Sequence, residues 1–419
     1  MKLPYHLRRF RSFMSAAYAG RKSIEQLEHW LADVAGVSLL YESHRYAAST
    51  PEGDGLENAL ALCQSMIIPL TRKAIESGWV AAQFDAGMNR QRMDGGMFRI
   101  IPVRVDDCDI PEIFQSSRWI DISWNGLSGE SAAKILSGLY PNPVRAWDGK
   151  SHDVYLIRSW KKAGDGFEDA VCETAKRLGF HLVVNPDENP TVEHSAESII
   201  SGCGAGIAIL RSGMSGTKLQ RVYRELDLFG RLGLPYIMIA DKALNLPTSV
   251  TQSSLQTLII DEETESIETG LSAKIQPLLM KLQEEWNPPP VRPYIFYGTD
   301  LKQEHKHRNR LVRQIIQQIV SMPCLMGEDI QHGQIQQEIV NRVINARMMV
   351  ADISKENLNT CIEAGIALGA NVPVHLVSGD ERHKPPFMFR DRQIWHYQTD
   401  LDLLGIVHKL VLPHRRIIV

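Results

Sequence analysis

The chain has 419 residues, of which 44% are hydrophobic and 23% are charged, as in an ordinary soluble globular protein. This length is enough for two or three domains, each with its own core. The formal net charge of −3 gives no basic footprint of the kind that binds nucleic acid. No apolar run approaches the length of a membrane span, and the basic residues near the start precede no secretory h-region. We therefore expect a soluble, cytoplasmic protein with neither a membrane nor a nucleic-acid partner.

The cysteines point to the same compartment. They are scattered and form no CxxC pair, and most lie in apolar stretches, which favours reduced core residues in a reducing cytoplasm. The six are Cys63, Cys108, Cys172, Cys203, Cys324 and Cys361.

One pattern of strand, polar loop, helix and second strand occurs three times along the chain. The helix position that faces the loop is Gln83, then Glu225, then Glu363, at spacings of 142 and 138 residues. A period of that size indicates three related domains rather than a short-repeat solenoid. The strand pairs are Ser65–Leu70 with Arg99–Val103, Gly206–Leu210 with Pro235–Ala240, and Met348–Asp352 with Val372–Val377.

Two proline-containing breaks, Tyr140–Asp153 and Trp286–Tyr294, separate the copies. They predict domains over residues 1–140, 151–285 and 293–419. Strands that alternate with helices of ten or more residues indicate parallel sheets with right-handed crossovers. We therefore predict three consecutive open parallel-sheet α/β domains of the flavodoxin-like or Rossmann-like kind. The second and third are expected to open with strands Asp153–Ile157 and Tyr294–Gly298, followed by helices over Phe167–Leu178 and Leu311–Val320.

Open α/β sheets bind ligands beyond the carboxyl ends of their strands. In the third copy, Gly298 and Asp300 close the opening strand, and Asp352 closes the strand Met348–Asp352. We expect Gly298 and Asp300 to contact substrate, together with Asn357 and Asn359 of the next loop.

Glu363 falls early in the helix that follows this loop. A carboxylate there can stabilise or attack the oxocarbenium-like centre that forms when a base leaves an anomeric carbon. One carboxylate can suffice for a cationic nicotinamide, whereas a neutral purine also needs a proton donor, for which Asp352 is the nearest candidate. An acid on a largely apolar helix is costly unless it has a partner or a task.

The third copy combines an acid at the strand end, an amide in the loop, an acid with two small residues on the helix, and a proline before the next strand: Asp352, Asn359, Glu363, Gly365, Ala367 and Pro373. With these positions, residues 348–377 resemble the nucleoside 2-deoxyribosyltransferase-like superfamily. The resemblance implies Glu363 as nucleophile or oxocarbenium stabiliser and Asp352 as a sugar ligand. Cys361 stands near a position where the family often has an aromatic residue. The middle copy resembles the same group through Glu225 and Pro235 but lacks the Asp and Asn of the loop, and Glu225 is a third catalytic candidate.

The helical stretch of the first copy, SGWVAAQFDAG, contains Ser77, Trp79 and Gln83. With this stretch the first copy, to about residue 140, resembles a bacterial TIR domain, which implies a TIR-like form of the predicted open parallel sheet. In NAD-cleaving TIR proteins the motif S-x-W-x-x-x-E supplies the catalytic glutamate. Ser77 and Trp79 match this motif, but Gln83 occupies the glutamate position. A neutral amide cannot stabilise an oxocarbenium as a carboxylate does. The resemblance therefore implies a degenerate site that binds a nucleotide through Trp79 and Gln83, or a domain for self-assembly with Ser43–Leu56 as its contact loop.

Structural explanations compete with each functional one. Glu225 lies on a helix rich in charges that pair along its length. Asp352 and Asn359 are also common at helix caps and turns, and Trp79 and Gln83 fit an ordinary helix core and surface. No P-loop, zinc spacing or Ser/His/Asp set occurs, so we expect no metal and no cofactor, with NAD as a candidate substrate.

Two functions stay open. One is an intracellular N-glycosidase that acts on NAD or a related nucleotide or nucleoside, as an anti-phage defence effector activated by oligomerisation. The other is a catalytically inactive TIR scaffold that senses a nucleotide and assembles. Expected partners are a nucleotide substrate or signal, further copies of the chain in an oligomer or filament, and a protein encoded elsewhere.

Overall fold

The computed structural model describes residues 10–15, 21–41, 52–115, 119–140, 152–158, 166–184, 196, 199–200, 202–212, 214, 216–261, 270–286, 292, 294–330, 335–354, 357–380, 386–415 and 417–418. The predicted breaks Tyr140–Asp153 and Trp286–Tyr294 lie mostly outside these residues. So does the predicted contact loop Ser43–Leu56 as far as residue 51, and its last residues begin a helix.

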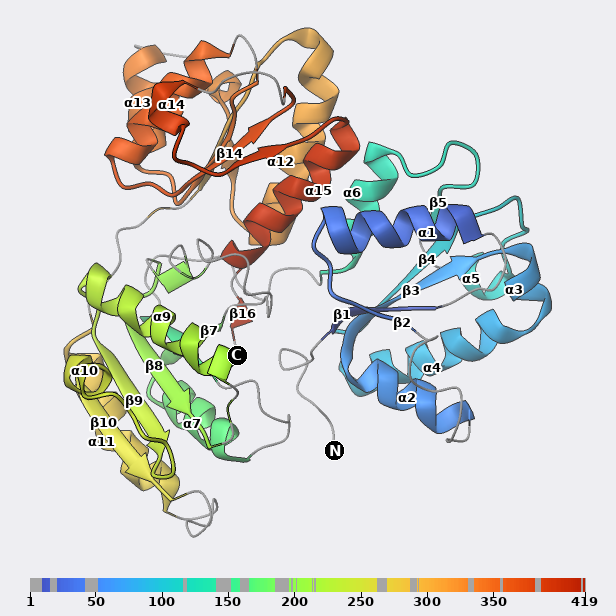
Figure 1. Ribbon diagram of the computed structural model, residues 1–419. Helices are drawn as coiled ribbons and strands as arrows, with labels where there is room; N and C mark the ends of the chain where they lie inside the picture. The colour runs from blue at the N-terminus through green and yellow to red at the C-terminus, as the bar shows by residue number, and fades with distance from the viewer. Residues whose placement is uncertain are drawn as a thin grey trace. The chain divides into compact units, whose positions relative to one another are not determined.

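The first domain is a five-stranded parallel sheet in the order β2-β1-β3-β4-β5 (Figure 1). Its central strand, β3, is buried along its whole length, as expected for a parallel strand covered on both faces. The elements are β1 (Phe10–Met14), α1 (Arg21–His29), η2 (Trp30–Val34), β2 (Leu39–Tyr41), α2 (Glu52–Ala61), β3 (Cys63–Leu70), α3 (Arg72–Glu76), α4 (Trp79–Met93), β4 (Arg99–Arg104), α5 (Glu112–Gln115), β5 (Ile120–Asp121) and α6 (Gly129–Gly138).

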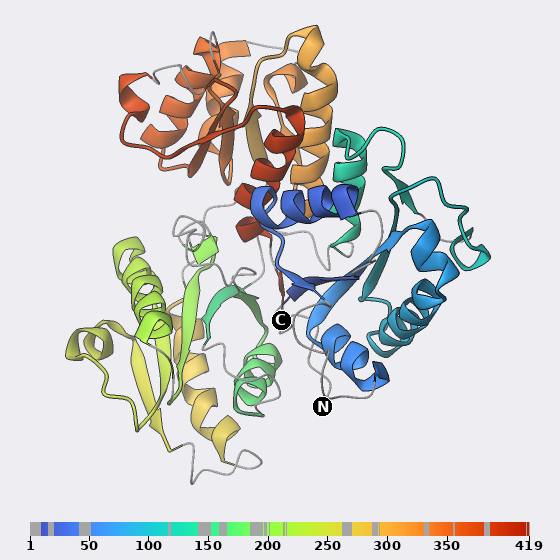
Figure 2. The same ribbon diagram turned by 45° about the vertical axis from the view of Figure 1, so that its right-hand side comes forward.

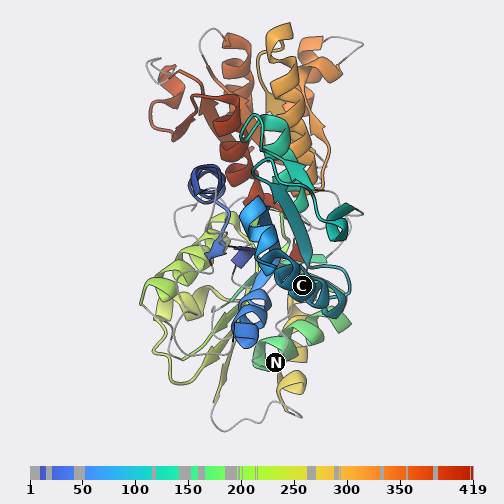
Figure 3. The same cartoon turned by 90° about the vertical axis from the view of Figure 1, so that its right-hand side faces the viewer.

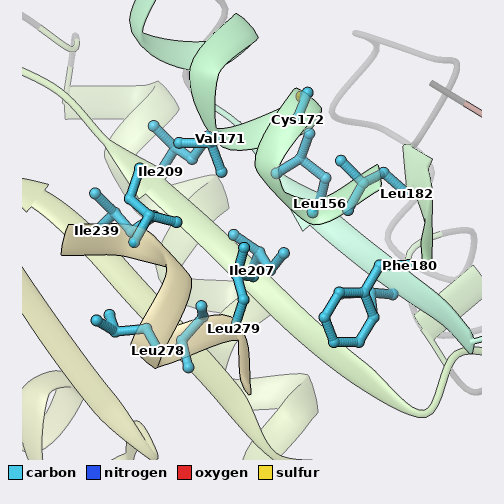
Figure 4. Close-up of a cluster of buried hydrophobic side chains, with 14 of the residues drawn as sticks. Leu156, Val171, Cys172, Phe180, Leu182, Ile207, Ile209, Ile239, Leu278 and Leu279 are labelled. Carbon is cyan, nitrogen blue, oxygen red and sulfur yellow. The ribbon is translucent and has the colours of Figure 1, made fainter. Parts of the chain in front are cut away.

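The middle domain has a six-stranded sheet in the order β10-β9-β8-β6-β7-β16. The core between this sheet and helices α7 and α11 is built from alternate strand residues such as Leu156, Ile207 and Ile209 (Figure 4). The elements are β6 (His152–Ile157), α7 (Gly166–Arg177), β7 (Phe180–Val184), β8 (Ala205–Leu210), α9 (Gly216–Leu232), β9 (Tyr236–Asp241), α10 (Thr248–Ser253), β10 (Gln256–Ile260), α11 (Leu271–Glu284) and β16 (Ile417–Ile418).

The last strand corrects one predicted boundary. β16 pairs antiparallel with β7, so the end of the predicted third domain, 293–419, belongs to the middle sheet. The compact unit formed by residues 147–293 accordingly includes residues 413–419. A strand of two residues is too short to show an apolar periodicity in the sequence. Its place is set by pairing with the otherwise open edge of β7.

The third domain is a five-stranded parallel sheet in the order β12-β11-β13-β14-β15. Helices α12 and α15 lie side by side on one face (Figures 2 and 3), and α13 and α14 pack with the apolar core on the other. The elements are β11 (Ile295–Gly298), η4 (Gln303–His305), α12 (Lys306–Val320), β12 (Cys324–Leu325), η5 (Gly327–Asp329), α13 (Ile335–Ile344), β13 (Met349–Asp352), α14 (Leu358–Gly369), β14 (Val374–Ser378), η6 (Phe387–Phe389), β15 (Ile394–His396), α15 (Asp400–Val411) and η7 (Leu412–His414).

The first and third domains share one compact unit, residues 2–146 with 294–412. His408 of α15 is fully buried, with its Nδ1 2.7 Å from the carbonyl oxygen of Ala35 and its Nε2 2.9 Å from the hydroxyl of Tyr140. The indole of Trp30 also donates to the carbonyl of Leu401 over 3.1 Å. Buried polar groups that are satisfied in this way fix one packing arrangement.

The predicted fold class, three consecutive open parallel-sheet α/β domains, is confirmed. All six cysteines are buried and take part in no disulfide, as their apolar surroundings predict. In the described part of the chain, no helix combines the length and apolar character needed to cross a membrane.

Candidate functional site

The candidate site lies where the strand order of the third sheet reverses. β11 has β12 on one side and β13 on the other, so the crossovers that leave β11 and β13 run in opposite directions. Such a switch point opens a crevice beyond the carboxyl ends of the two central strands. Gly298 ends β11 and Asp352 ends β13, and helix α14 begins six residues after Asp352. The predicted location in the third copy is thus the geometric switch point.

Glu363 lies on α14 beside the end of β11. A Cβ added to Gly298 would be 3.0 Å from Glu363 Oε2 and 3.0 Å from a methyl of Thr360. The glycine therefore lets the carboxyl group lie directly against the strand backbone. Burial raises the pKa of Glu363 to about 7. Within the described residues no ion pair or hydrogen bond holds this carboxyl group, so desolvation is the only cause of the shift.

Asp352 has the opposite environment. Its Oδ2 accepts from Tyr397 over 2.9 Å and lies 3.3 Å from the guanidinium of Arg308. Its Oδ1 accepts from the hydroxyl and backbone N–H of Ser354. The side chains of Arg308 and Asp352 are only 7% and 3% exposed. Asp352 is therefore the acceptor at the centre of a buried network, which leaves little of it for a sugar.

This hydrogen-bond network connects residues at the ends of β11, β13, β14 and β15. Arg308 reaches Thr299, after β11, over 3.3 Å, and Tyr397 follows β15 directly. The N–H of Gly379, after β14, donates to Ser354 over 2.8 Å. Because these loops form the edge of the switch point, the network sets the shape of the site.

The two predicted carboxylates lie on opposite faces of the sheet. Met349 and Ala351 belong to the core under α13 and α14, so alternation along β13 turns Asp352 to the other face, where Arg308 of α12 meets it. Glu363 approaches Gly298 from the α14 side. The two carboxyl groups therefore do not form a paired acid and base, and Asp352 is poorly placed to protonate a base that leaves next to Glu363.

The other predicted contacts of the third copy lie at the same edge. Asn357 caps α14: its Oδ1 accepts from Thr360 N, and its Nδ2 donates to Asp352 O over 3.0 Å. Asn359 is exposed in the first turn of α14. Asp300 forms a 3.0 Å ion pair with Lys302. Asn359 and Asp300 thus present polar groups to solvent beside the switch point, whereas Asn357 acts on the local backbone.

In the middle domain Glu225 is almost wholly buried on α9. Its carboxylate accepts from Arg221 one turn away over 3.2 Å. Burial raises its pKa, opposed by Arg221 and by the hydroxyl of Tyr155. An intrahelical ion pair accounts for this residue without a catalytic task.

In the first domain Gln83 is 0% exposed on α4. Trp79, the first residue of that helix, is 36% exposed and follows Gly78, whose φ of 72° lies in the left-handed region. Trp79 can therefore contact a ligand, whereas Gln83 lies inside the domain.

Sequence reasoning did not identify Arg308 and Tyr397 as site residues. Arg308 lies within a run of basic residues typical of a solvated helix face, and Tyr397 is 45 residues from Asp352, to which it donates. The helical spacing of α12 is the one hint that Arg308 is buried. Leu311 and Val312, three and four residues further on, lie on the same buried face of the helix as Arg308.

Comparison with known proteins identifies the first domain. Residues 13–136 match the family model of the TIR domain. Among solved structures, the TIR domain of the Toll-related receptor TRR-2 from Hydra magnipapillata is 12% identical, covers 27% of this chain and 83% of that chain, and has a TM-score of 0.23. A metazoan TIR-STING receptor from C. gigas, solved in complex with 2′,3′-cGAMP, is 9% identical, covers 67% of this chain and 97% of that chain, and has a TM-score of 0.25. No curated protein sequence matches the chain.

The family-model match supports a TIR domain at residues 13–136, in agreement with the resemblance of the first copy. The two structural likenesses have TM-scores too low to bear on any site. The resemblance of the later domains to nucleoside 2-deoxyribosyltransferases stays a prediction.

Proposed function

We propose that the third domain cleaves the N-glycosidic bond of a nucleotide or nucleoside, with NAD as the leading candidate, and that Glu363 carries the chemistry. The observation behind this proposal is a partly buried carboxyl group at a switch point, with a pKa raised to about 7 and no partner among the described residues. Perturbed carboxyl groups of this kind concentrate at active sites.

The reaction follows from the charge that Glu363 can offer. As the bond between C1′ and the nicotinamide nitrogen breaks, its electron pair neutralises the pyridinium, and the sugar becomes an oxocarbenium cation. The ionised Glu363 lies in low-dielectric surroundings, where its attraction to that cation is strong. Water then adds to C1′ and releases a proton, which gives ADP-ribose and nicotinamide. No acid has to protonate the leaving group, which suits a site from which Asp352 is turned away.

A role in anti-phage defence, with activation by oligomerisation, belongs to the same proposal and rests on the TIR match of the first domain. The rival function is an inactive TIR scaffold that senses a nucleotide. It is favoured by one observation, the amide Gln83 at the position where NAD-cleaving TIR proteins have a glutamate.

The test is base release by purified full-length protein from NAD, NADP, ATP and deoxynucleosides, with products separated by chromatography. Glu363→Gln is compared with wild type and with Glu328→Gln, which alters an exposed carboxylate of the same domain. Release by wild type and control, reduced at least a hundredfold in Glu363→Gln, supports the proposal. Full activity of Glu363→Gln removes the residue from the mechanism. If wild type and both variants release no base, also after forced oligomerisation, the result favours the inactive scaffold.

A further inference from the structure

The exposed side of helix α14 carries no charged residue. Its exposed positions are Leu358, Asn359, Ile362 and Gly369. The one charged residue of the helix, Glu363, is partly buried. Helix α12 of the same domain instead exposes basic residues in its first turns. Helices that are apolar on every side are ordinarily buried. The outer side of α14 thus has the composition of a buried surface.

Large apolar side chains gather on this side of the helix. Leu358 and Ile362 lie one turn apart on α14 and are 68% and 53% exposed. Met388 of η6 adjoins them, because its sulfur lies 3.3 Å from where a Cβ on Gly365 would stand, one turn after Ile362. Phe387 directly precedes Met388 and is 84% exposed. We refer to Leu358, Ile362, Phe387 and Met388 as the α14 patch.

The α14 patch is large for the surface of a monomer. At about 200 Å² for a large side chain, its exposed fractions of between 53% and 84% correspond to roughly 500 Å². The largest apolar patch on a typical monomer covers about 300 to 600 Å² and often has a function. A standard interface buries about 800 Å² on each partner. The patch therefore supplies more than half of one side of such an interface.

The composition of the patch favours a second copy of this chain as its partner. Interfaces between identical subunits are the most apolar, and interface centres are depleted of charge and enriched in Met and aromatic residues. The four side chains of the α14 patch carry no charge with which to select a different protein by electrostatic complementarity. A two-fold axis requires that one patch be complementary to itself. A neutral patch meets this requirement, because no like charges oppose each other.

Charged residues begin at the border of the patch. The guanidinium of Arg390 lies over the ring of Phe387, 5.6 Å from its centroid. Asp391 and Arg392, the next two residues, are exposed. An apolar centre with a polar rim is the ordinary anatomy of a protein interface. Because this rim carries both signs of charge, the acidic group of one copy can lie near an arginine of the other.

We propose that two copies of the chain associate about a two-fold axis through the α14 patch. Leu358 and Phe387 are its most exposed members and lose the most contact with solvent. Association of this kind does not depend on glycosidase activity. One consequence rests on the proposed function: Ile362 directly precedes Glu363, so a second copy on the patch reduces the access of solvent to that carboxyl group.

The test is the mass of the full-length protein in solution, measured by size-exclusion chromatography with light scattering over a series of concentrations. Wild type is expected to shift from monomer to dimer as the concentration rises. Leu358→Lys and Phe387→Lys should each raise the dissociation constant of the dimer at least about thirtyfold, the effect of losing a central interface side chain. Trp124→Lys is the matched control, because Trp124 is 77% exposed in the first domain, and it should dimerise as wild type does.

Opposite charges at one position give a second test. Leu358→Lys and Leu358→Glu should each stay monomeric, whereas a mixture of the two should dimerise, because their charges attract across the axis. Circular dichroism and Tm show whether each variant is folded, and where a Lys variant fails to fold, the Ser variant replaces it.

The proposal is overturned if wild type is monomeric at the highest concentration it tolerates, if folded patch variants associate as wild type does, or if the mixture stays monomeric. None of these measurements involves base release, so a failure of the proposed glycosidase function leaves their outcome unchanged.

Discussion

Replacement of Glu363 by Gln tests whether the carboxyl group is desolvated in the folded protein, and the test needs no substrate. The pKa of Glu363 is raised from 4.5 to about 7 by burial. Below pH 4.5 the group is protonated in both the folded and unfolded states, so burial of charge costs nothing. Above pH 7 the folded state must hold a desolvated carboxylate, whereas the unfolded chain holds a hydrated one. The wild type therefore loses stability, relative to Glu363→Gln, as the pH rises between these values.

The size of the effect follows from the shift. The pKa difference of about 2.5, at about 1.4 kcal/mol per pKa unit, sets a ceiling of roughly 3.5 kcal/mol. Because the side chain keeps some exposure, solvent screening reduces this, and we expect Glu363→Gln to gain about 2 kcal/mol on wild type between pH 5 and pH 8. Hydrogen exchange of the amides of α14 and β13, followed by mass spectrometry, measures the local opening free energy in this domain.

The control is Glu328→Gln, since Glu328 is exposed in the same domain. It should show no such gain. A difference between wild type and Glu363→Gln that stays flat from pH 5 to pH 8 would refute the reasoning, because it would mean that the carboxyl group is hydrated in the folded protein.

Four further outcomes are expected. The kcat/KM for base release should rise about tenfold per pH unit below about 7 and level off above it, because the ionised Glu363 acts; a fall above pH 7 in a pH–rate series would instead assign the activity to the protonated group. Gly298→Ala places a methyl group 3.0 Å from Glu363 Oε2 and 2.5 Å from the terminal methyl group of the buried Met349, so it should lower kcat/KM about tenfold and also lower Tm; an unchanged kcat/KM in the folded variant would show that the carboxyl group acts from another position. Asp352→Asn leaves the buried Arg308 without its anion and should cost about 3–5 kcal/mol of unfolding free energy in urea titrations, and a loss below about 1 kcal/mol would contradict a buried ion pair. Gln83→Glu, in the Glu363→Gln background, should lower Tm more at pH 8 than at pH 5 and create no activity, because the new carboxylate is fully buried; release of nicotinamide would instead reveal an intact TIR site.

The fold could be predicted because the strands of parallel sheets are continuous apolar runs. Stretches such as Ala205–Leu210 and Met349–Asp352 are buried along their whole length, and each is followed by a helix of the length that a crossover needs. Strand order was not predicted: right-handed crossovers leave only a few arrangements, and the structure shows which of them each sheet adopts. The location of the candidate site then followed from topology alone.

The electrostatics of the site could not be predicted, because burial of a charge depends on partners that are distant in sequence. The sequence equally allowed Asp352 as a sugar ligand and as a structural residue. The choice depends on Arg308 and Tyr397, which lie 44 and 45 residues away and contact it only in the folded sheet. The pairing of Ile417 and Ile418 is a stronger case, because nothing in their run of basic and apolar residues indicates a partner strand more than two hundred residues earlier.

The three switch points also differ in a way that the repeated pattern conceals. All three sheets share one strand order around the switch, yet the repeated helix position offers the buried amide Gln83 in the first domain, Glu225 in an ion pair with Arg221 in the middle domain, and Glu363 in the third. A carboxylate stabilises a developing cation, whereas a neutral amide does not, and the charge of an ion-paired carboxylate is already offset. If domains of one fold were used redundantly, the same group would recur at each edge. The different groups instead favour a division of tasks, in which the proposed chemistry is confined to the third domain.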